Sequence, residues 1–277
     1  MLINQAVKHF FISKKWAAMA PARRLQPGRT AARVRLGRAA AIAGLAGLAG
    51  VVAATLSGCQ RSEVSEGVQA WFPLHGGQVH TYRVTETGEE HGDQPAISEW
   101  TLTAKGPATL DGKPVWLRHH SEGVTLFLEA TEHGIRRVAT QPDIDSQPTP
   151  DAEPRWVIKA PLQVGTEWTT PTVPYLLLRK NEHPRSLKHT HKLNMVWRIA
   201  HMDDEVTTPA GTFKPCMRLE GEGALNLFTD PVNGFNNVPI VSREWYCLGK
   251  GLVKFEREET VPKGFLTGGK LVAEWVR

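Results

Sequence analysis

The sequence predicts an all-β fold, mainly antiparallel, in which two related β-meanders form a curved sheet or a half-open barrel. Beyond residue 70 the chain consists of short runs in which β-branched and aromatic residues alternate with polar ones, the period of a half-buried strand. Turn dipeptides separate these runs, among them Asp111-Gly112, His133-Gly134 and Asn233-Gly234. The sequence shows no amphipathic helical pattern that lasts three turns.

The strand pattern recurs along the whole chain beyond residue 70. The predicted strands are 79–85, 98–104, 115–120, 124–130, 135–140, 193–200, 217–220, 243–247, 252–256 and 271–276. Two other segments are predicted to be long loops: 141–154 is rich in Pro and Asp, and 179–191 is basic and rich in histidine.

An internal repeat divides the predicted strands into two halves. Pro73-Leu74-x-x-Gly77 matches Pro161-Leu162-x-x-Gly165, and each copy is followed by a strand that contains a tryptophan. The halves span about 71–140 and 155–277. Chance similarity between two meanders is the alternative. A true repeat predicts two meanders side by side in one continuous sheet.

The segment before the strands has the order of a bacterial lipoprotein signal. Basic residues precede an uncharged run at 39–55, and Leu56-Ser57-Gly58-Cys59 resembles a lipobox. The resemblance implies a diacylglyceryl group on the sulfur of Cys59, cleavage before Cys59 and acylation of the new amino terminus. An uncleaved membrane helix with a chance cysteine is the alternative. Met19 is a second possible start of the chain.

We therefore divide the chain into a signal or precursor segment (1–58), a lipidated tether (59–70) and a β-rich periplasmic domain (71–277). Gln60, rather than Asp, follows the cysteine. This choice resembles the sorting signal of outer-membrane lipoproteins and implies the periplasmic face of the outer membrane, with the membrane as a partner through the lipid anchor.

Net charge argues against a nucleic-acid partner. Nine of the 33 Lys and Arg residues lie in 1–58, and none of the 28 Asp and Glu residues does. Residues 59–277 therefore carry 24 basic against 28 acidic side chains, a formal charge of −4. The basic patch that a nucleic-acid-binding domain needs has no support in this composition.

Cys216 and Cys247 remain as a pair in a compartment where disulfides persist, which predicts a bridge between two strands. Two buried free thiols are the alternative. His189 and His191 are the best candidates for a metal site, because alternate residues of a strand share a face. A solvated basic loop is the commoner explanation, and we predict no metal or other cofactor.

The chain contains none of the common catalytic signatures, and we assign no residue a catalytic role. The acidic pair Glu258-Glu259 lies beside a predicted turn and is expected to be solvated. Trp100, Trp116 and Trp197 lie on predicted strands and could line a ligand groove on the concave face of the sheet. Burial in the core is the alternative, since strands favour aromatic residues.

Three segments carry a wider resemblance. They are Phe72-Pro73-Leu74 with Gly77 and Tyr82, the run Thr208-Pro209-Ala210-Gly211-Thr212-Phe213, and Trp245-Tyr246 followed by Gly249, Gly251, Leu252, Val253 and Lys254. Together they resemble a group of uncharacterised bacterial envelope lipoproteins, although His80 stands where that group usually has Trp and Cys247 follows the usual Trp-Tyr pair. The resemblance implies a β-rich periplasmic fold and no established activity.

The leading functional hypothesis is a non-enzymatic, membrane-anchored lipoprotein that binds a hydrophobic or saccharide ligand or an envelope partner. A structural or assembly lipoprotein without a small-molecule site is the second, and a hydrolase with an unrecognised site is the third.

Overall fold

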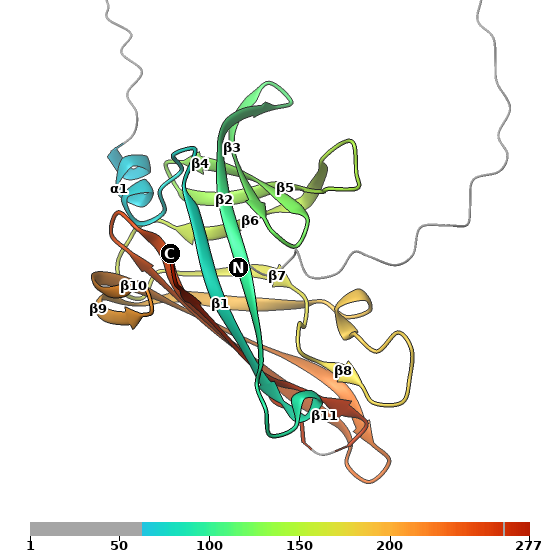
Figure 1. Cartoon of the computed structure of the whole chain (residues 1–277). Coiled ribbons are helices and arrows are strands. Elements are labelled where there is room, and N and C mark those ends of the chain that lie inside the picture. The colour runs from blue at the N-terminus through green and yellow to red at the C-terminus, as the bar shows by residue number, and fades with distance from the viewer. Residues whose placement is uncertain (1–62, 263) are drawn as a thin grey trace, which may run out of the picture. The chain divides into compact units, whose positions relative to one another are not determined.

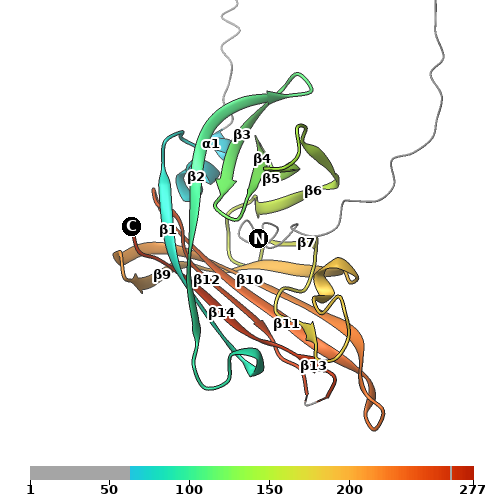
Figure 2. The ribbon, with the colours of Figure 1, turned by 45° about the vertical axis from the view of Figure 1, so that its right-hand side comes forward.

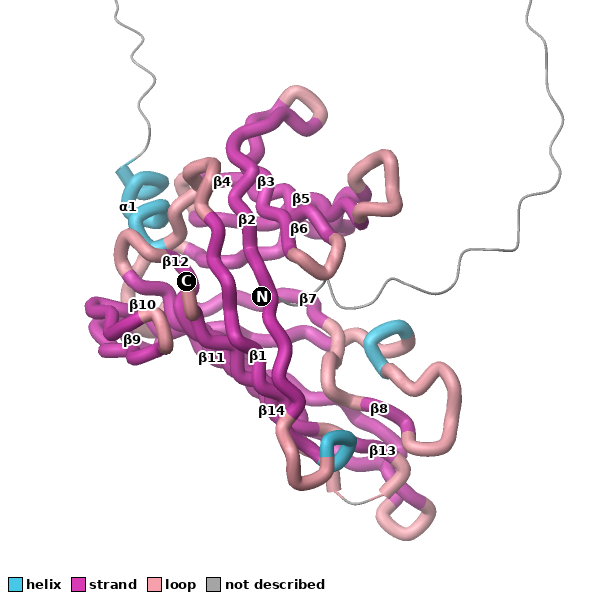
Figure 3. Tube along the Cα trace, in the orientation of Figure 1, coloured by secondary structure: helices cyan, strands magenta, loops and turns pink. Residues whose placement is uncertain are grey.

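The computed structural model describes residues 63–262 and 264–277. The predicted precursor segment, Cys59 and the start of the tether lie outside the described residues. About two thirds of the described chain is strand, all of it antiparallel, and short helical segments and loops connect the strands (Figure 3). The predicted fold class is confirmed.

The twelve strands of the main sheet form two meanders of six, each hydrogen-bonded in chain order. The first meander contains β1 (Val79–Gly88), β2 (Ala96–Leu110), β3 (Lys113–His120), β4 (Val124–Thr131), β5 (Gly134–Pro142) and β6 (Thr149–Lys159). The second contains β7 (Glu167–Thr172), β9 (Leu193–Thr208), β10 (Gly211–Asp230), β11 (Gly234–Cys247), β12 (Gly251–Glu259) and β14 (Gly269–Trp275). A separate two-stranded sheet pairs β8 (Leu178–Arg179) with β13 (Leu266–Thr267).

One seam joins the two meanders. The first strand of the first meander, β1, pairs antiparallel with the last strand of the second, β14, in a register that places Tyr82 opposite Trp275. The resulting sheet runs from β6 at one edge to β7 at the other, and it curves into a nearly closed barrel (Figures 1 and 2). The predicted continuous sheet of two meanders is confirmed.

The second seam, between β6 and β7, is not a hydrogen-bonded strand pair. Proline has no N–H to donate, and the facing edges carry Pro150 and Pro154 on β6 and Pro171 on β7. The side chain of Arg155 bridges the gap instead, and its Nη1 donates to the carbonyl of Pro171 over 3.1 Å. The barrel is therefore open along the line between β6 and β7.

The repeat identified in the sequence corresponds to one backbone arrangement that is used twice. Gly77 N donates to the carbonyl of Ala104 over 2.8 Å, and Gly165 N donates to the carbonyl of Ile199 over 2.9 Å. Both glycines have positive φ, 88° and 92°, a conformation that residues with a Cβ rarely adopt. Each copy of the motif therefore turns the chain into the first strand of its meander.

The tryptophan match between the halves is shifted by two residues. His80 and Trp168 occupy equivalent places in the repeat, and their cross-strand partners are Leu102 and Trp197 respectively. Trp197 therefore corresponds to Leu102, not to Trp100. Because alternate residues share a face, the shift leaves both tryptophans on the inner side of the sheet.

The predicted tether is wrong for residues 63–70. They form most of helix α1 (Glu63–Trp71), where Val68 is buried, and Phe72 directly after it is also buried. The ring of Phe72 lies against Tyr246, with centroids 5.9 Å apart, and the guanidinium of Arg118 lies 4.2 Å from its centroid. Helix α1 therefore belongs to the folded domain, where its end closes one mouth of the barrel.

Candidate functional site

The interior of the barrel is filled by the protein's own side chains. One continuous cluster of buried apolar residues includes members of both meanders, α1 and the segment 173–192 between β7 and β9, which we call the strap. The strap contributes Leu177 and Leu187, both almost fully buried. The concave face is consequently a core rather than an open groove, which corrects the expectation that function would lie there.

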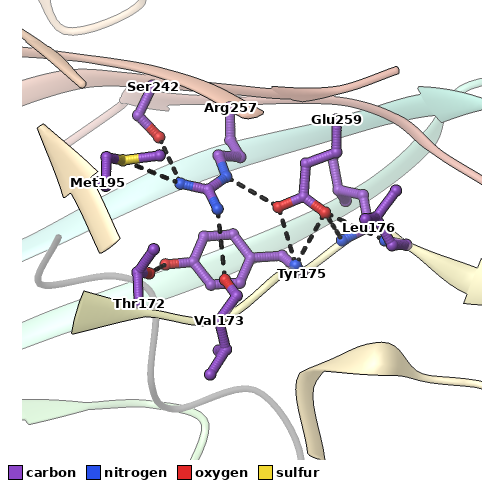
Figure 4. A network of polar contacts seen from close by, with 9 residues as sticks. Thr172, Val173, Tyr175, Leu176, Met195, Ser242, Arg257 and Glu259 are labelled. Carbon is purple, nitrogen blue, oxygen red and sulfur yellow. Dashed lines mark hydrogen bonds and ion pairs between the residues drawn. The ribbon is translucent and has the colours of Figure 1, made fainter. Parts of the chain in front are cut away.

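A buried ion pair fixes the strap to the sheet (Figure 4). Arg257 Nε donates to Glu259 Oε1 over 2.9 Å, and both side chains are almost fully buried. Glu259 also accepts backbone N–H groups of Tyr175, Leu176 and Leu177 at distances of 2.9 to 3.1 Å. The prediction that Glu259 is solvated is wrong, because its partners come from a distant part of the chain.

The remaining nitrogens of Arg257 are also engaged. Nη1 donates to Ser242 Oγ over 2.9 Å, Nη2 donates to the carbonyl of Val173 over 3.3 Å, and the guanidinium lies 4.2 Å from the centroid of the Tyr175 ring. These hydrogen bonds and the ion pair with Glu259 compensate the positive charge of Arg257, whose burial would otherwise be costly. The network is structural, because it binds the strap to the sheet.

The best candidate site is an apolar hollow at the tip of the β10–β11 hairpin. Its volume is about 480 Å³. Phe228, Phe235 and Phe265 line it although 45, 68 and 45 % of their surfaces are exposed. The ring centroids of Phe228 and Phe235 are 5.5 Å apart and those of Phe228 and Phe265 are 6.3 Å apart. Clustered exposed aromatic rings of this kind mark a binding surface.

Hydrogen bonds hold the walls of this phenylalanine hollow in place. Phe265 N donates to the carbonyl of Thr229 over 2.7 Å, and Lys180 N donates to the carbonyl of Phe265 over 2.8 Å. At the hairpin turn, Asp230 Oδ1 accepts the backbone N–H groups of Val232 and Asn233, each over 2.8 Å. Bonds with Asn233 also lower the pKa of Asp230. These bonds fix the position of the hairpin turn and of Phe265 in the wall of the hollow.

The rim of the phenylalanine hollow is polar. The buried Leu187, Leu227 and Leu266 complete its apolar lining, and the polar residues around it are Arg179, Asn181, Glu182, His191 and Asn226. Burial, and then the neighbouring charge of Arg179, lower the pKa of His191. An apolar interior with a few polar groups at its edge is the usual construction of a ligand site.

Trp100 lies beside a second hollow, of about 330 Å³, between the β1–β2 hairpin, the start of β14 and the strap. Its lining also includes Tyr175, Glu86 and Glu90. Arg185 donates to Glu90 over 2.6 Å and lowers the pKa of this carboxyl group. Trp100 itself is only 4 % exposed, so it offers a ligand little surface.

The three tryptophans proposed for one groove lie apart. Trp197 is buried on β9 in the second meander, whereas Trp116 is partly buried on β3 in the first. Trp116 stands opposite Pro107, seven residues along β2 from Trp100. The prediction of a shared groove is wrong, and burial of Trp100 and Trp197 follows from their inward positions on strands.

The predicted disulfide is confirmed. Cys216 on β10 and Cys247 on β11 stand directly opposite each other, with Cα atoms 4.0 Å apart, and are bonded. The bridge joins neighbouring strands at the end of β11 that lies beside α1, where Gly249 N donates to the carbonyl of Ala70 over 2.6 Å.

The two candidate metal ligands do not share a strand face. His189 ends a 3-10 helix (Leu187–His189), and His191 follows it in the strap, with Nδ1 2.8 Å from the hydroxyl of Thr190. Within residues 63–262 and 264–277, no group of three His, Cys, Asp or Glu side chains is arranged to hold a metal ion. The strand on which this hypothesis depended begins only at Leu193.

The phenylalanine hollow was not predicted from the sequence. A signal for it exists, because Phe228 and Phe235 flank the Asn233-Gly234 turn, but the strand predicted here stopped at residue 220 whereas β10 continues to Asp230. Phe265 and the strap reach the hairpin only through tertiary contacts, which local patterns do not encode.

No family model matches the chain, and no curated protein matches it. Among solved structures, a protein from Bacteroides fragilis described provisionally as exported, with a YmcC-like fold, is 12% identical; the match covers 73% of this chain and 95% of that one, with a TM-score of 0.35. A provisionally described lipoprotein from Parabacteroides distasonis is also 12% identical, over 74% of this chain and 97% of that one, with a TM-score of 0.32.

Likeness at this level bears on neither activity nor ligand. Helices that could span a membrane, judged by length and apolar character, do not occur in the part of the chain that the structure describes.

Proposed function

We propose that the protein is a lipoprotein held through Cys59 at the periplasmic face of the outer membrane, and that its β domain is a non-enzymatic binding module. The order of basic flank, uncharged run, small residues and cysteine supports the anchor. Two or more acyl chains hold a protein firmly on a bilayer, whereas one chain binds only reversibly.

The observation that carries the binding function is the phenylalanine hollow. Three partly exposed phenylalanine rings surround a space of about 480 Å³, and the buried part of its lining is leucine. Burying apolar surface contributes roughly 25 cal/mol per Å² removed from water. The hollow therefore suits an apolar group better than a saccharide, and a hydrophobic ligand or an apolar part of a partner is its occupant.

The anchor is tested by metabolic labelling with a palmitate analogue. The wild-type protein should be labelled and the Cys59→Ala variant should not. Gln60→Asp should leave labelling intact and shift the protein from the outer to the inner membrane fraction. Labelling that survives Cys59→Ala would refute the anchor.

The hollow is tested by ¹⁹F NMR of the lipidated protein that begins at Cys59, held in lipid nanodiscs, with 4-fluorophenylalanine in place of phenylalanine and decanoate as the probe. We expect saturable shifts for Phe228, Phe235 and Phe265, assigned by single Phe→Leu variants, and none for the buried Phe255. If the three signals do not move, the binding function fails and a purely structural role takes its place.

A further inference from the structure

Strand β10 is longer than its neighbour β9. Their pairing ends at Glu222 opposite Val196, although β10 continues to Asp230. If β9 began earlier in the same register, His191 would stand opposite Leu227. The chain instead leaves that line before Leu193 and enters the strap.

The phenylalanine hollow occupies the place that an earlier start of β9 would have filled. Leu227 and Phe228 of β10 line one side of it, and Leu187 and His191 of the strap line the other. Beyond the hollow the edge of β10 is covered again, because Thr229 accepts the N–H of Phe265. In the described chain, residues 225–228 of β10 have no strand paired with them on this side.

This stretch lacks the features that protect other strand edges. Residues 224–228 read Ala-Leu-Asn-Leu-Phe, without proline or charge. The edges at the open seam, by contrast, carry Pro150 and Pro154 on β6 and Pro171 on β7. Proline and charge on an edge strand prevent another chain from pairing with it. The edge of β10 is open to such pairing and lies beside an apolar hollow.

We propose that the hollow receives an extended polypeptide segment of a partner protein. The segment adds as a strand to the edge of β10 at residues 225–228 and places an apolar side chain against Phe228 and Phe235. Backbone hydrogen bonds then supply affinity and the hollow supplies specificity, as in other cases of strand addition. This inference rests on the proposed function and names the chemical class of the occupant.

The position of the hollow favours a partner over a lipid of the anchoring membrane. Phe235 and Cys247 lie at opposite ends of β11, and twelve residues of strand span about 40 Å. Helix α1, which follows the proposed anchor in the sequence, lies at the Cys247 end (Figures 1 and 2). The hollow therefore lies at the end of β11 away from the helix at which the described domain begins.

The test uses fluorescein-labelled octapeptides that alternate threonine with one apolar residue type. Each is made in an ordinary form and with every backbone amide N-methylated. Binding to the lipidated protein in nanodiscs is followed by fluorescence anisotropy. At least one ordinary peptide should bind saturably, and N-methylation should weaken it at least tenfold, because side chains are kept while backbone donors are lost. Phe235→Ala should weaken it by a similar factor, whereas Val232→Ala, at the tip but outside the hollow, should not.

Equal affinity of the two forms would overturn strand addition, and so would failure of every ordinary peptide to bind. If either result is obtained and the decanoate shifts are saturable, the proposed binding function stands and its ligand is a small apolar molecule. If the decanoate shifts are absent as well, both strand addition and the proposed binding function are refuted.

Discussion

Arg257 and Glu259, two residues apart on β12, form an ion pair that is sealed inside the barrel, with Nε and Oε1 2.9 Å apart. The same carboxylate accepts three consecutive backbone N–H groups of the strap. A single side chain of the sheet therefore holds the segment that forms one wall of the phenylalanine hollow. The integrity of the hollow depends on an interaction outside it.

Glu259→Gln should lower the free energy of unfolding by about 3 to 5 kcal/mol, because it leaves the charge of Arg257 buried without a counterion. The matched control is Glu89→Gln, which removes the exposed partner of Lys180 and should cost less than about 1 kcal/mol. Urea denaturation measures both. Equal losses of unfolding free energy in the two variants would mean that the buried ion pair stabilises the protein no more than the exposed one.

Loss of the disulfide should cost about 3 to 4 kcal/mol, since it closes a loop of 31 residues and restricts the unfolded chain. The comparison is the wild-type protein against the Cys216→Ser, Cys247→Ser double variant, again in urea. Quantitative labelling of both thiols in the native, oxidised protein would contradict the bridge.

Stability should fall as the pH drops from about 6.5 to about 4. Burial, followed by the neighbouring charge of His119, lowers the pKa of His120 to about 4, and burial, Arg118 and Lys250 lower the pKa of His80 to about 4. Below its ordinary pKa each imidazole takes up a proton in the unfolded chain but not in the folded one. The stabilisation is complete above pH 6.5 and is lost as the pH falls through the folded-state pKa.

The geometry of His120 explains why it stays neutral. Its Nδ1 accepts the N–H of Glu122 over 3.1 Å, so protonation there would break that bond. Urea denaturation of His120→Gln at several pH values should show a shallower pH dependence than the wild type. The exposed His133→Gln variant is the control and should follow the wild-type curve. If the free energy of unfolding depends on pH in the same way in all three proteins, His120 is excluded as a source of the pH dependence.

Gly221→Ala should destabilise the protein, whereas Gly67→Ala should stabilise it by up to about 1 kcal/mol. A Cβ at Gly221 would lie 2.7 Å from the ring of Trp197 and 2.8 Å from the sulfur of Met195, but at Gly67, inside α1, it would meet nothing within 4 Å. Thermal melts separate the two variants. A stabilising Gly221→Ala would show that Trp197 is not packed as the structure has it.

The tryptophans themselves provide a related test. Trp197→Ala should cost about 3 to 5 kcal/mol, as truncation of a buried aromatic side chain does. Trp116 is only partly buried, and its truncation to Ala should cost less. The same thermal melts measure both variants. Equal losses would mean that the side chain of Trp116 contributes as much to the core as Trp197.

The sequence predicted the features that depend on local patterns. Alternation located most strands, the Pro-Leu-x-x-Gly motif identified the two meanders, and Cys216 with Cys247 defined a disulfide. The motif succeeded because its glycines need a backbone conformation that few other residues adopt. A constraint of this kind is visible in the sequence because it acts on the glycine itself and needs no distant partner.

The features that could not be predicted depend on distant partners. Glu259 looks like a solvated acid beside a turn until the strap is placed next to it. Residues 63–70 look polar, yet Val68 is buried, together with Phe72 just beyond the helix, in a mouth of the barrel that exists only after both meanders have met. The phenylalanine hollow is of the same kind, since its walls come from three separate segments.

The seam between β1 and β14 has a consequence for how the chain folds. Within each meander the paired strands are neighbours in sequence, so they can form early and locally. Tyr82 and Trp275, by contrast, come from nearly opposite ends of the domain and meet only after most of the chain has been ordered. Closing so long a loop carries a large entropic cost before any contact rewards it. We expect the pairing of β1 with β14 to limit the folding rate. The domain then reaches its native state only when β14, the last of its strands in the sequence, has joined the sheet.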